Sequence, residues 1–549
     1  MSAKLIRGRV AFQKLRTRKI IRATHAQAEG KKPTNKEAKR CEVSISGYLK
    51  GKTLFLTGAT GFLAKVLLEK VLWEQPDINA IFLLITPKSG ITAADRLQGQ
   101  ILSSSIFDRL RDRHGTDFTA VVARKLVSMD GDIGKEKLGL SPKDMQKIAQ
   151  EADVFINAAA TTAFDERLDK AIDVNTLGPQ RLLKLAAQCM KLQMFCHVST
   201  AFVSGMREGR VKEEPLCPGL SIAVEQGYQG ADTLNLYEEI KNGCVHAAQT
   251  FRIEHAEDNG EVLIEKYLTE KLKILGQTRA KRQGWQDTYV FTKAMGEQLL
   301  VHHRGDIPLA IVRPSIVESA WSEPTPGWIE GLRMADPILV AYGKGHLQGF
   351  VGDRYGVLDM VPVDFVVNAM LATLPVHANV DEVKVYHVAT SVANPLNINN
   401  FVQIVSKSFA EQPLKTQSGD NVAVRKMKIF RSREAFLLHN YLEHVFPAEV
   451  ALLQAYFATG PEYRERTRQY RMVKKMRKQL THFANIYMPY TFYAARFDTS
   501  ETYALFESLS QEDQVSFNFD LNKIEWDHYL SRFHIPGIVT HLLKGHGKA

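Results

Sequence analysis

Short apolar runs recur along most of the chain and are separated by longer stretches with helical periodicity. Such runs, bounded by turn-forming residues, are typical of strands buried on both faces of a sheet. They predict strands at 53–56, 80–85, 125–130, 154–157, 194–199, 309–313 and 385–388. Because helical stretches separate these strands, the connections are crossovers and the sheet is parallel. The pattern therefore predicts an α/β fold with a doubly wound parallel sheet.

Two segments depart from this alternation. Residues 206–285 are charged and fall between the fifth and sixth predicted strands, so we expect a helical insertion on the substrate side of the sheet. Residues 421–549 are rich in aromatic side chains and are predicted to be mainly helical. We therefore predict a sheet-containing domain at 46–410 and a mainly helical C-terminal domain at 411–549.

The first predicted strand runs into a glycine turn and then into a helix over 62–72. Gly58 lets the chain turn, and Gly61 lets the backbone approach a ligand closely. This arrangement holds a dinucleotide pyrophosphate, because the free amides and the helix dipole attract negative charge. The fold is therefore predicted to be Rossmann-like. The residues expected to contact the cofactor here are Thr57, Gly58, Thr60, Gly61, Phe62 and Leu63.

Residues after the other strands extend the predicted cofactor site, because ligands of such sheets bind beyond the carboxyl ends of the strands. No acidic residue follows the second strand, where it would bind the ribose of NAD, and Lys88 lies close by. This favours NADPH, although Lys88 as a plain exposed loop residue is the alternative. Further contacts are expected from Asp132 and Ile133 at the adenine, from the small residues Ala158 and Ala159, and from Pro314, Ser315 and Ile316 at the nicotinamide.

Hydride chemistry on a carbonyl needs a proton donor, and a tyrosine serves when a nearby cation lowers its pKa. A lysine four residues further on lies on the same helix face. The chain contains five such pairs: Tyr48/Lys52, Tyr237/Lys241, Tyr267/Lys271, Tyr289/Lys293 and Tyr470/Lys474. We select Tyr289 and Lys293, because their helix over 290–302 runs directly into the sixth strand. That places them beside Ser199 and Thr200, which complete the predicted catalytic set, with Tyr237/Lys241 as the alternative pair.

Composition limits the remaining possibilities. The chain has 549 residues, 45% apolar and 24% charged, which is typical of a globular protein with two or three domains. No run of 18 apolar residues occurs, so we expect no membrane-spanning helix. The five cysteines lack the paired spacing of a zinc site. We therefore expect no bound metal and a reducing, cytoplasmic location.

The net charge of +11 lies in one segment. Residues 1–40 hold 13 Lys and Arg against 2 Asp and Glu, and the rest of the chain carries 58 of each sign. We predict a disordered basic arm at 1–45. An arm that binds an anionic membrane surface and a transit peptide are the alternatives. Nucleic acid is not an expected partner, because no known binding module follows the arm.

At the residues singled out above, the chain resembles the extended short-chain dehydrogenase/reductase superfamily. Within it, the chain is most similar to fatty acyl-CoA reductases of the bacterial alcohol-forming type. The resemblance covers roughly residues 46–545. Its segments are 57–64, 197–201, 287–293, 312–319 and 328–331, with 517–520 and 526–530 in the C-terminal part.

The resemblance implies NADPH-dependent reduction of long-chain acyl-CoA, or of an acyl carrier protein thioester, to the aldehyde and then to the primary alcohol. It implies that Tyr289 is the acid, that Lys293 orients the ribose and lowers the pKa of Tyr289, and that Thr200, with Ser199 beside it, holds the oxygen. Two positions depart from the family pattern. Thr86 stands where an arginine usually binds the 2′-phosphate, and Ala64 replaces a glycine.

Three alternative functions stay open. Reduction could stop at the aldehyde, the chain could be a sterol or sugar-nucleotide enzyme of the same superfamily, or it could be a non-catalytic nucleotide-binding scaffold. A second basic block, Arg464–Lys478, contains eight Lys and Arg and one acid. It is expected to be either an exposed charged helix or a surface for an anionic membrane or CoA phosphates. Peripheral membrane contact is thus a further expectation, and no oligomeric state is predicted.

Overall fold

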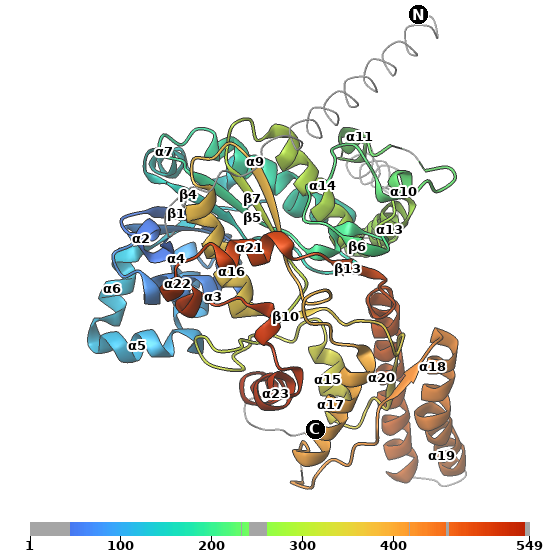
Figure 1. The fold of residues 1–549 in the computed structure, drawn as a ribbon. Coiled ribbons are helices and arrows are strands. Elements are labelled where there is room, and N and C mark those ends of the chain that lie inside the picture. The colour runs from blue at the N-terminus through green and yellow to red at the C-terminus, as the bar shows by residue number, and fades with distance from the viewer. Residues whose placement is uncertain (1–43, 232, 241–260, 417, 457–460, 544–549) are drawn as a thin grey trace, which may run out of the picture. The chain divides into compact units, whose positions relative to one another are not determined.

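A parallel sheet of seven strands forms the centre of the computed structural model, which describes residues 44–231, 233–240, 261–416, 418–456 and 461–543 (Figure 1). The strand order is β11-β7-β5-β4-β1-β2-β3, and each neighbouring pair is parallel. Their bounds are β1 Thr53–Thr57, β2 Ala80–Ile85, β3 Leu126–Asp130, β4 Val154–Asn157, β5 Met194–Val198, β7 Leu309–Pro314 and β11 Val383–Val388. The predicted α/β fold is confirmed.

Helices cover both faces of the sheet. Leu54 and Leu56 of β1 belong to the same buried cluster as residues of α3 and α16. Phe55, between them, belongs to the opposite cluster with Phe155 and residues of α7 and α9. Burial on both faces explains why the strands are continuously apolar. These helices are α3 Phe62–Glu74, α7 Pro142–Glu151, α9 Gly178–Ala186 and α16 Val363–His377.

The segment 206–285 is only partly helical, which differs from the expectation. It contains the helices α10 Ile222–Glu225, α11 Leu236–Ile240 and α13 Glu261–Arg282, and residues 241–260 lie outside the description. Gly209–Val211, however, form strand β6, which pairs in parallel with β13 (Ala495–Phe497) near the other end of the chain. Local charge and periodicity cannot reveal such a pairing, because its partner is distant in sequence.

The C-terminal part is mainly helical, as predicted, and contacts the sheet-containing part extensively. It follows α17 (Ile398–Glu411), and its main elements are β12 Lys428–Phe430, α18 Arg433–Asn440, α19 Phe446–Tyr456, α20 Pro461–Thr491, α21 Ser500–Glu507 and α22 Gln511–Ser516. Strand β12 pairs with β9 (Gly349–Val351). Contacts among the described residues from 44 onward unite them into one compact unit, and the boundary at 411 stays a prediction. The predicted basic arm lies outside the described residues, except for its last two positions.

Within the described segments, none of the helices is both long enough and apolar enough to cross a membrane. The long helix α20 illustrates the reason, because Lys and Arg fill its first half.

Candidate active site

A cavity of about 540 Å³ lies beyond the carboxyl ends of the central strands. The turn after β1, residues that follow β4 and β5, the end of β7, and α14 (Thr288–His303) form most of its wall. Ile486, Tyr487 and Tyr490 of α20 complete it. Ligands of doubly wound sheets bind at this position. The predicted site residues that line the cavity are Gly58, Gly61, Phe62, Leu63, Ala158, Ser199, Thr200, Tyr289, Lys293, Pro314 and Ser315.

The glycine turn is shaped to receive a ligand close to the backbone. Gly58 has a φ of +76°, and a Cβ there would lie 2.7 Å from the carbonyl oxygen of Ala158. Only glycine therefore allows the turn to pass so near the end of β4. The N–H of Gly61 donates to the carbonyl of Gly58 at 2.8 Å, and α3 begins directly afterwards at Phe62. Since Gly61 has no side chain to cap α3, the first amides of the helix remain available to phosphate.

Two buried hydroxyl groups in the cavity wall have no partner among the described residues. Ser199 Oγ follows β5 and Ser315 Oγ follows β7, and both residues are less than 10% exposed. An unsatisfied buried hydroxyl is costly, so such groups in a cavity usually meet a polar ligand. Together with the amides of the glycine turn, they fit a dinucleotide cofactor that lies across the strand ends.

Tyr289, Lys293 and Thr200 meet at the end of β5. Lys293 Nζ donates to the carbonyl of Val198 at 2.6 Å. Burial lowers the pKa of Lys293 to about 8. Burial and the negative charge of Asp287 raise the pKa of Tyr289 above its usual value, and the neighbouring Thr200 side chain opposes that shift. The net direction is opposite to the lowering that the resemblance implies, because desolvation of the phenol outweighs its favourable contacts.

A buried polar chain connects the glycine turn with the lysine. Thr57 Oγ1 donates to Asn157 Oδ1 at 2.7 Å, and Asn157 Nδ2 lies 3.0 Å from His197 Nδ1. His197 Nε2 lies 3.4 Å from Lys293 Nζ. Burial and the charge of Lys293 hold the pKa of His197 well below its usual value, so the imidazole is neutral. Thr57 thus faces this chain, and it also accepts the N–H of Ala159 at 3.2 Å.

Sequence analysis missed Asn157 and His197. One feature of the sequence could have identified them: each is a polar residue at or near the end of an otherwise apolar strand, β4 or β5. A buried polar side chain at such a position needs a partner, and here the partners come from neighbouring strands and α14.

The end of β2 carries positive charge from an unexpected residue. Lys88 is exposed in a turn that bridges to Ile91. Arg96 of α4 (Ala93–Arg96) donates from Nη1 to the carbonyl of Thr86. Its guanidinium therefore lies beside Thr86, the position at which the resembling family usually has an arginine. Sequence analysis overlooked Arg96, although Thr92 and Asp95 form the capping box that begins its helix.

The other predicted cofactor residues lie around the cavity without lining it. Asp132 Oδ1 accepts the N–H of Gly134 at 2.9 Å, and the side chain of Ile133 is buried against Gly178 of α9. Thr60 is part of the glycine turn, and Ile316 begins β8 (Ile316–Glu318), which pairs with β10 (Met360–Pro362). Their roles in cofactor binding stay predictions.

The other Tyr–Lys pairs lie outside this cavity. In the pairs that begin at Tyr48, Tyr267 and Tyr470, the lysine ammonium lies 5.2–5.9 Å from the centre of its tyrosine ring, a local cation–π contact. Tyr237 is 59% exposed and hydrogen-bonds to His303 Nε2 at 3.0 Å, whereas Lys241 lies outside the described residues. None of these tyrosines lines the cavity.

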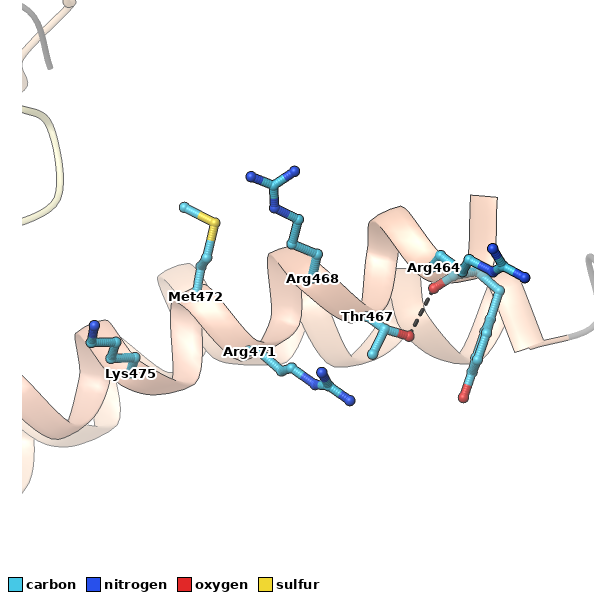
Figure 2. A pocket seen from close by; sticks show the side chains of 7 residues that line it. Arg464, Thr467, Arg468, Arg471, Met472 and Lys475 are labelled. Carbon is cyan, nitrogen blue, oxygen red and sulfur yellow. Dashed lines mark hydrogen bonds between the residues drawn. The ribbon is translucent and has the colours of Figure 1, made fainter. Parts of the chain in front are cut away.

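The second basic block forms an exposed face of α20. Figure 2 shows that Arg464, Arg468, Arg471 and Lys475 extend from successive turns of this helix. They line a shallow hollow of about 500 Å³, and all of its lining residues among those described belong to α20. The same helix reaches the cavity beyond the strand ends with Tyr487, about 18 Å further along its axis from Lys475 at the usual rise per residue.

Known proteins resemble this chain over most of its length. The family model described as male sterility protein matches residues 56–370, and a second model with the same description matches residues 450–545. Fatty acyl-CoA reductase 2, chloroplastic, of Arabidopsis thaliana is 40% identical over 92% of this chain and 80% of its own length. Alcohol-forming fatty acyl-CoA reductase of Simmondsia chinensis is 35% identical over 91% and 99%, respectively.

Among solved structures, the terminal R domain from the myxalamid PKS-NRPS biosynthetic pathway is similar in fold. The TM-score is 0.53 with 16% sequence identity, over 89% of this chain and 91% of that one. At this level of identity, the likeness supports the fold only.

Proposed function

This chain belongs to the fatty acyl-CoA reductase family, and we propose that it reduces long-chain fatty acyl thioesters with NADPH. One observation carries the proposal: the glycine turn, the pair Tyr289/Lys293 and the wall from α20 share a cavity. A nucleotide-binding scaffold needs only the turn. The added proton donor and aromatic wall favour catalysis on a large apolar substrate.

Residues of the cavity, together with Arg96 and Lys88 after β2, would bind the parts of the cofactor. The amides after Gly58 and Gly61 would hold the pyrophosphate, and Arg96 with Lys88 would hold the 2′-phosphate. Ser315 would bind near the nicotinamide. When bound, NADPH supplies the hydride for the reduction.

Residues of this chain would bind the carbonyl oxygen of the thioester and donate a proton to it. Thr200, which lines the cavity beside Tyr289, would hold the thioester oxygen, and Tyr289 would donate a proton as negative charge develops there. The raised pKa of Tyr289 keeps the phenol protonated at neutral pH, and Lys293, with a pKa of about 8, remains largely cationic. Collapse of the protonated adduct would break the carbon–sulfur bond and release thiol and aldehyde. The same groups would then serve reduction of the aldehyde to the primary alcohol.

Aromatic side chains support an apolar acyl site beside the reacting carbonyl. The ring of Tyr490 lies 5.1 Å from that of Phe164 and 4.9 Å from that of Phe202, and all three residues line the cavity. The basic face of α20 would bind the phosphates of CoA or an acidic acyl carrier protein. An anionic membrane surface would suit the same charges, which supports peripheral membrane contact in a cytoplasmic enzyme.

The decisive experiment measures how many NADPH molecules are oxidised for each thiol that is released. Purified full-length protein is given NADPH and acyl-CoA substrates of several chain lengths, and NADPH oxidation and free thiol are followed together. Two NADPH consumed for each thiol means alcohol as the product, and one means aldehyde. If the protein binds NADPH but does not oxidise it when acyl-CoA is added, the chain is a non-catalytic nucleotide-binding scaffold. Acyl carrier protein thioesters and NADH, tested in parallel, define the carrier and the cofactor.

Membrane contact has a separate test. Flotation with vesicles of anionic and of neutral phospholipid is compared for the full chain and for a chain without residues 1–40. Loss of flotation on truncation assigns the contact to the arm, and equal flotation of the two forms removes the arm from the proposal.

A further inference from the structure

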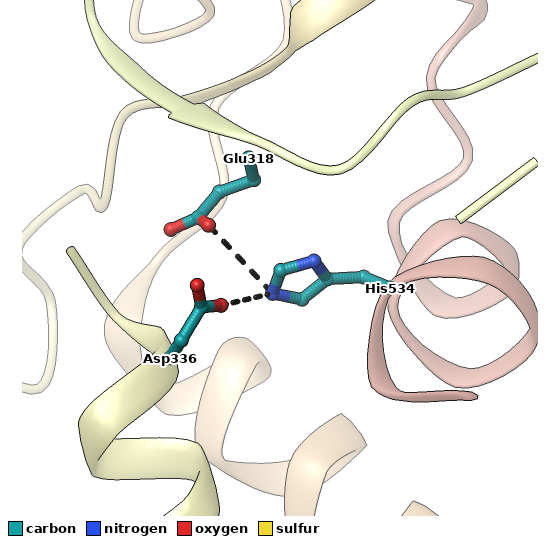
Figure 3. A group of neighbouring side chains, drawn as sticks. All are labelled: Glu318, Asp336 and His534. Carbon is teal, nitrogen blue, oxygen red and sulfur yellow. Dashed lines mark ion pairs between the residues drawn. The ribbon is translucent and has the colours of Figure 1, made fainter. Parts of the chain in front are cut away.

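Three side chains from distant parts of the sequence converge in the interior, next to the catalytic cavity. Glu318 ends β8, Asp336 begins α15 (Asp336–Gly343), and His534 ends the C-terminal helical turn Tyr529–His534. Figure 3 shows the two carboxylates and the imidazole pointing toward one another. All three residues are fully buried, and one ligand atom from each lies within 4.8 Å of the others. His534 Nε2 is 3.3 Å from Asp336 Oδ1 and 3.9 Å from Glu318.

The atoms that converge have no hydrogen-bond partner in the described part of the chain. These atoms are Glu318 Oε2, Asp336 Oδ1 and His534 Nε2. The second oxygen of each carboxylate is held by the backbone, since the N–H of Ala335 donates to Glu318 Oε1 at 3.4 Å and that of Arg333 to Asp336 Oδ2 at 2.8 Å. The backbone therefore fixes both carboxylates with their remaining oxygens directed at His534.

The hydrogen bonds behind His534 indicate which ring nitrogen carries its proton. Ser319 Oγ donates to the hydroxyl of Tyr529 at 3.4 Å, and that hydroxyl donates to the carbonyl of Ser319 at 2.7 Å. Ser319 Oγ is thus free to accept, and it lies 3.1 Å from His534 Nδ1. The proton then belongs on Nδ1, which leaves the lone pair of Nε2 facing the two carboxylates. Metal-binding histidines are held in the same way by a partner on the other nitrogen.

Three lone pairs that face one another in a dry interior are costly unless protons or a metal ion lie between them. Protons alone would have to number two, one shared by Glu318 and Asp336 and one shared by Asp336 and His534 Nε2. A divalent ion would contact all three atoms and balance both carboxylate charges. Ligand atoms about 2.1 Å from a tetrahedral ion lie about 3.4 Å apart, which is close to the separations of this cluster. We infer that Glu318, Asp336 and His534 form a binding site for a divalent transition-metal ion, with Zn²⁺ as the best match to this ligand set.

The site would hold the C-terminal segment against the wall of the catalytic cavity. The loop between Trp328 and α15 contributes Leu332, Arg333 and Met334 to that wall, and Arg333 lies 5.0 Å above the ring of Phe62. An ion bound at the base of this loop would fix it to β8 and to His534. The sequence predicted no bound metal, because it lacks the closely spaced Cys and His of a typical zinc site. These ligands are distant in sequence and include two carboxylates.

The test uses full-length protein purified with an affinity tag that contains no histidine. After dialysis in metal-free buffer, elemental analysis is expected to find about one divalent ion per chain. Removal of the ion with EDTA should lower the thermal midpoint, and ZnCl₂ should restore it. CoCl₂ added to the stripped protein should give the visible absorption of a low-symmetry Co²⁺ site.

Two variants and one control separate a metal site from a buried ion pair. Asp336→Asn should lose the bound ion and the response to ZnCl₂. Ser319→Ala keeps all three ligands, and its Zn²⁺ affinity should fall about 10–100-fold because His534 loses its orienting partner. Asp364→Asn is the matched control, since Asp364 is equally buried but accepts the N–H groups of Trp321 and Ser322. It should keep the ion.

The inference would be overturned if the wild-type protein held no stoichiometric ion, showed no change of thermal midpoint with ZnCl₂ and gave no visible absorption with Co²⁺. The cluster would then hold protons only. These readouts do not depend on acyl reduction, so they also separate a failure here from a failure of the proposed function.

Discussion

The hydroxyl of Tyr490, in the C-terminal helix α20, donates a hydrogen bond to Asp287 Oδ2, in the residue that caps α14. Asp287 Oδ1 accepts the N–H of Val290 at 2.9 Å, so the carboxylate joins the two helices at the first turn, which carries Tyr289. Burial raises the pKa of Asp287 to about 6, and the bond from Tyr490 opposes that shift. The C-terminal part therefore helps to position the proposed proton donor.

Tyr490→Phe should destabilise the protein by about 1.5–3 kcal/mol, the usual cost of losing a hydrogen bond to a charged group. The ring stays in place, so the aromatic wall is kept. Urea unfolding measures the stability, and turnover should fall because the first turn of α14 loosens. Tyr355→Phe is the control, since Tyr355 is 74% exposed. Equal stability of the two variants would show that the bond contributes nothing.

Tyr289→Phe should lower turnover about 10²–10⁴-fold, because the general acid is lost while the ring is retained. Affinity for NADPH, measured by fluorescence titration, should stay nearly unchanged. Tyr237→Phe tests the alternative pair and should retain full turnover, because Tyr237 is exposed outside the cavity. A large loss in Tyr237→Phe with an active Tyr289→Phe would reverse the assignment.

Lys293 should impose an alkaline limit on activity. Its pKa of about 8 lies below the usual value, so the ammonium is charged below pH 8 and neutral above it. The cation stabilises negative charge at the site, and kcat/KM should therefore fall as the pH rises through about 8. Lys293→Arg should move this limit to higher pH at reduced activity, because guanidinium keeps its proton. An unchanged alkaline limb in Lys293→Arg would exclude Lys293 as its source.

Ser199→Ala should weaken ligand binding and leave the stability of the free protein unchanged. The Ser199 hydroxyl is buried without a partner among the described residues, so its removal should not destabilise the free protein. Binding of cofactor or substrate should weaken by about 0.5–1.5 kcal/mol, the value of one hydrogen bond. Ser204→Ala should behave in the opposite way, because Ser204 Oγ donates to the carbonyl of Ala201 at 2.6 Å. Thermal unfolding and ligand titration of both variants check the contrast.

Arg96→Gln should reduce the preference for NADPH over NADH. The expected loss is about 1.5–3 kcal/mol of NADPH binding, because a charge-assisted bond to the 2′-phosphate disappears. The KM for NADH should change little. Arg124→Gln, at an exposed position of α6 (Phe118–Lys125), serves as the control for loss of one positive charge. A similar change in both variants would point to general electrostatics and away from a phosphate contact.

Local patterns were enough to predict the sheet, the glycine turn and the presence of Tyr289 and Lys293 beside the end of β5. Continuous apolar runs mark buried strands, and a helix that enters the next strand directly must lie beside the previous one. Gly58 was recognisable for the same reason, since its turn is defined by adjacent residues.

Contacts between side chains that are distant in sequence became visible only in the folded chain. The chain Thr57–Asn157–His197–Lys293, the bond from Tyr490 to Asp287 and the cluster of Glu318, Asp336 and His534 all join separate elements. The direction of the Tyr289 pKa also depended on packing, because desolvation is set by what surrounds the phenol. Periodicity shows which face of an element is buried, but the partner across that face is chosen by the packing of the whole chain.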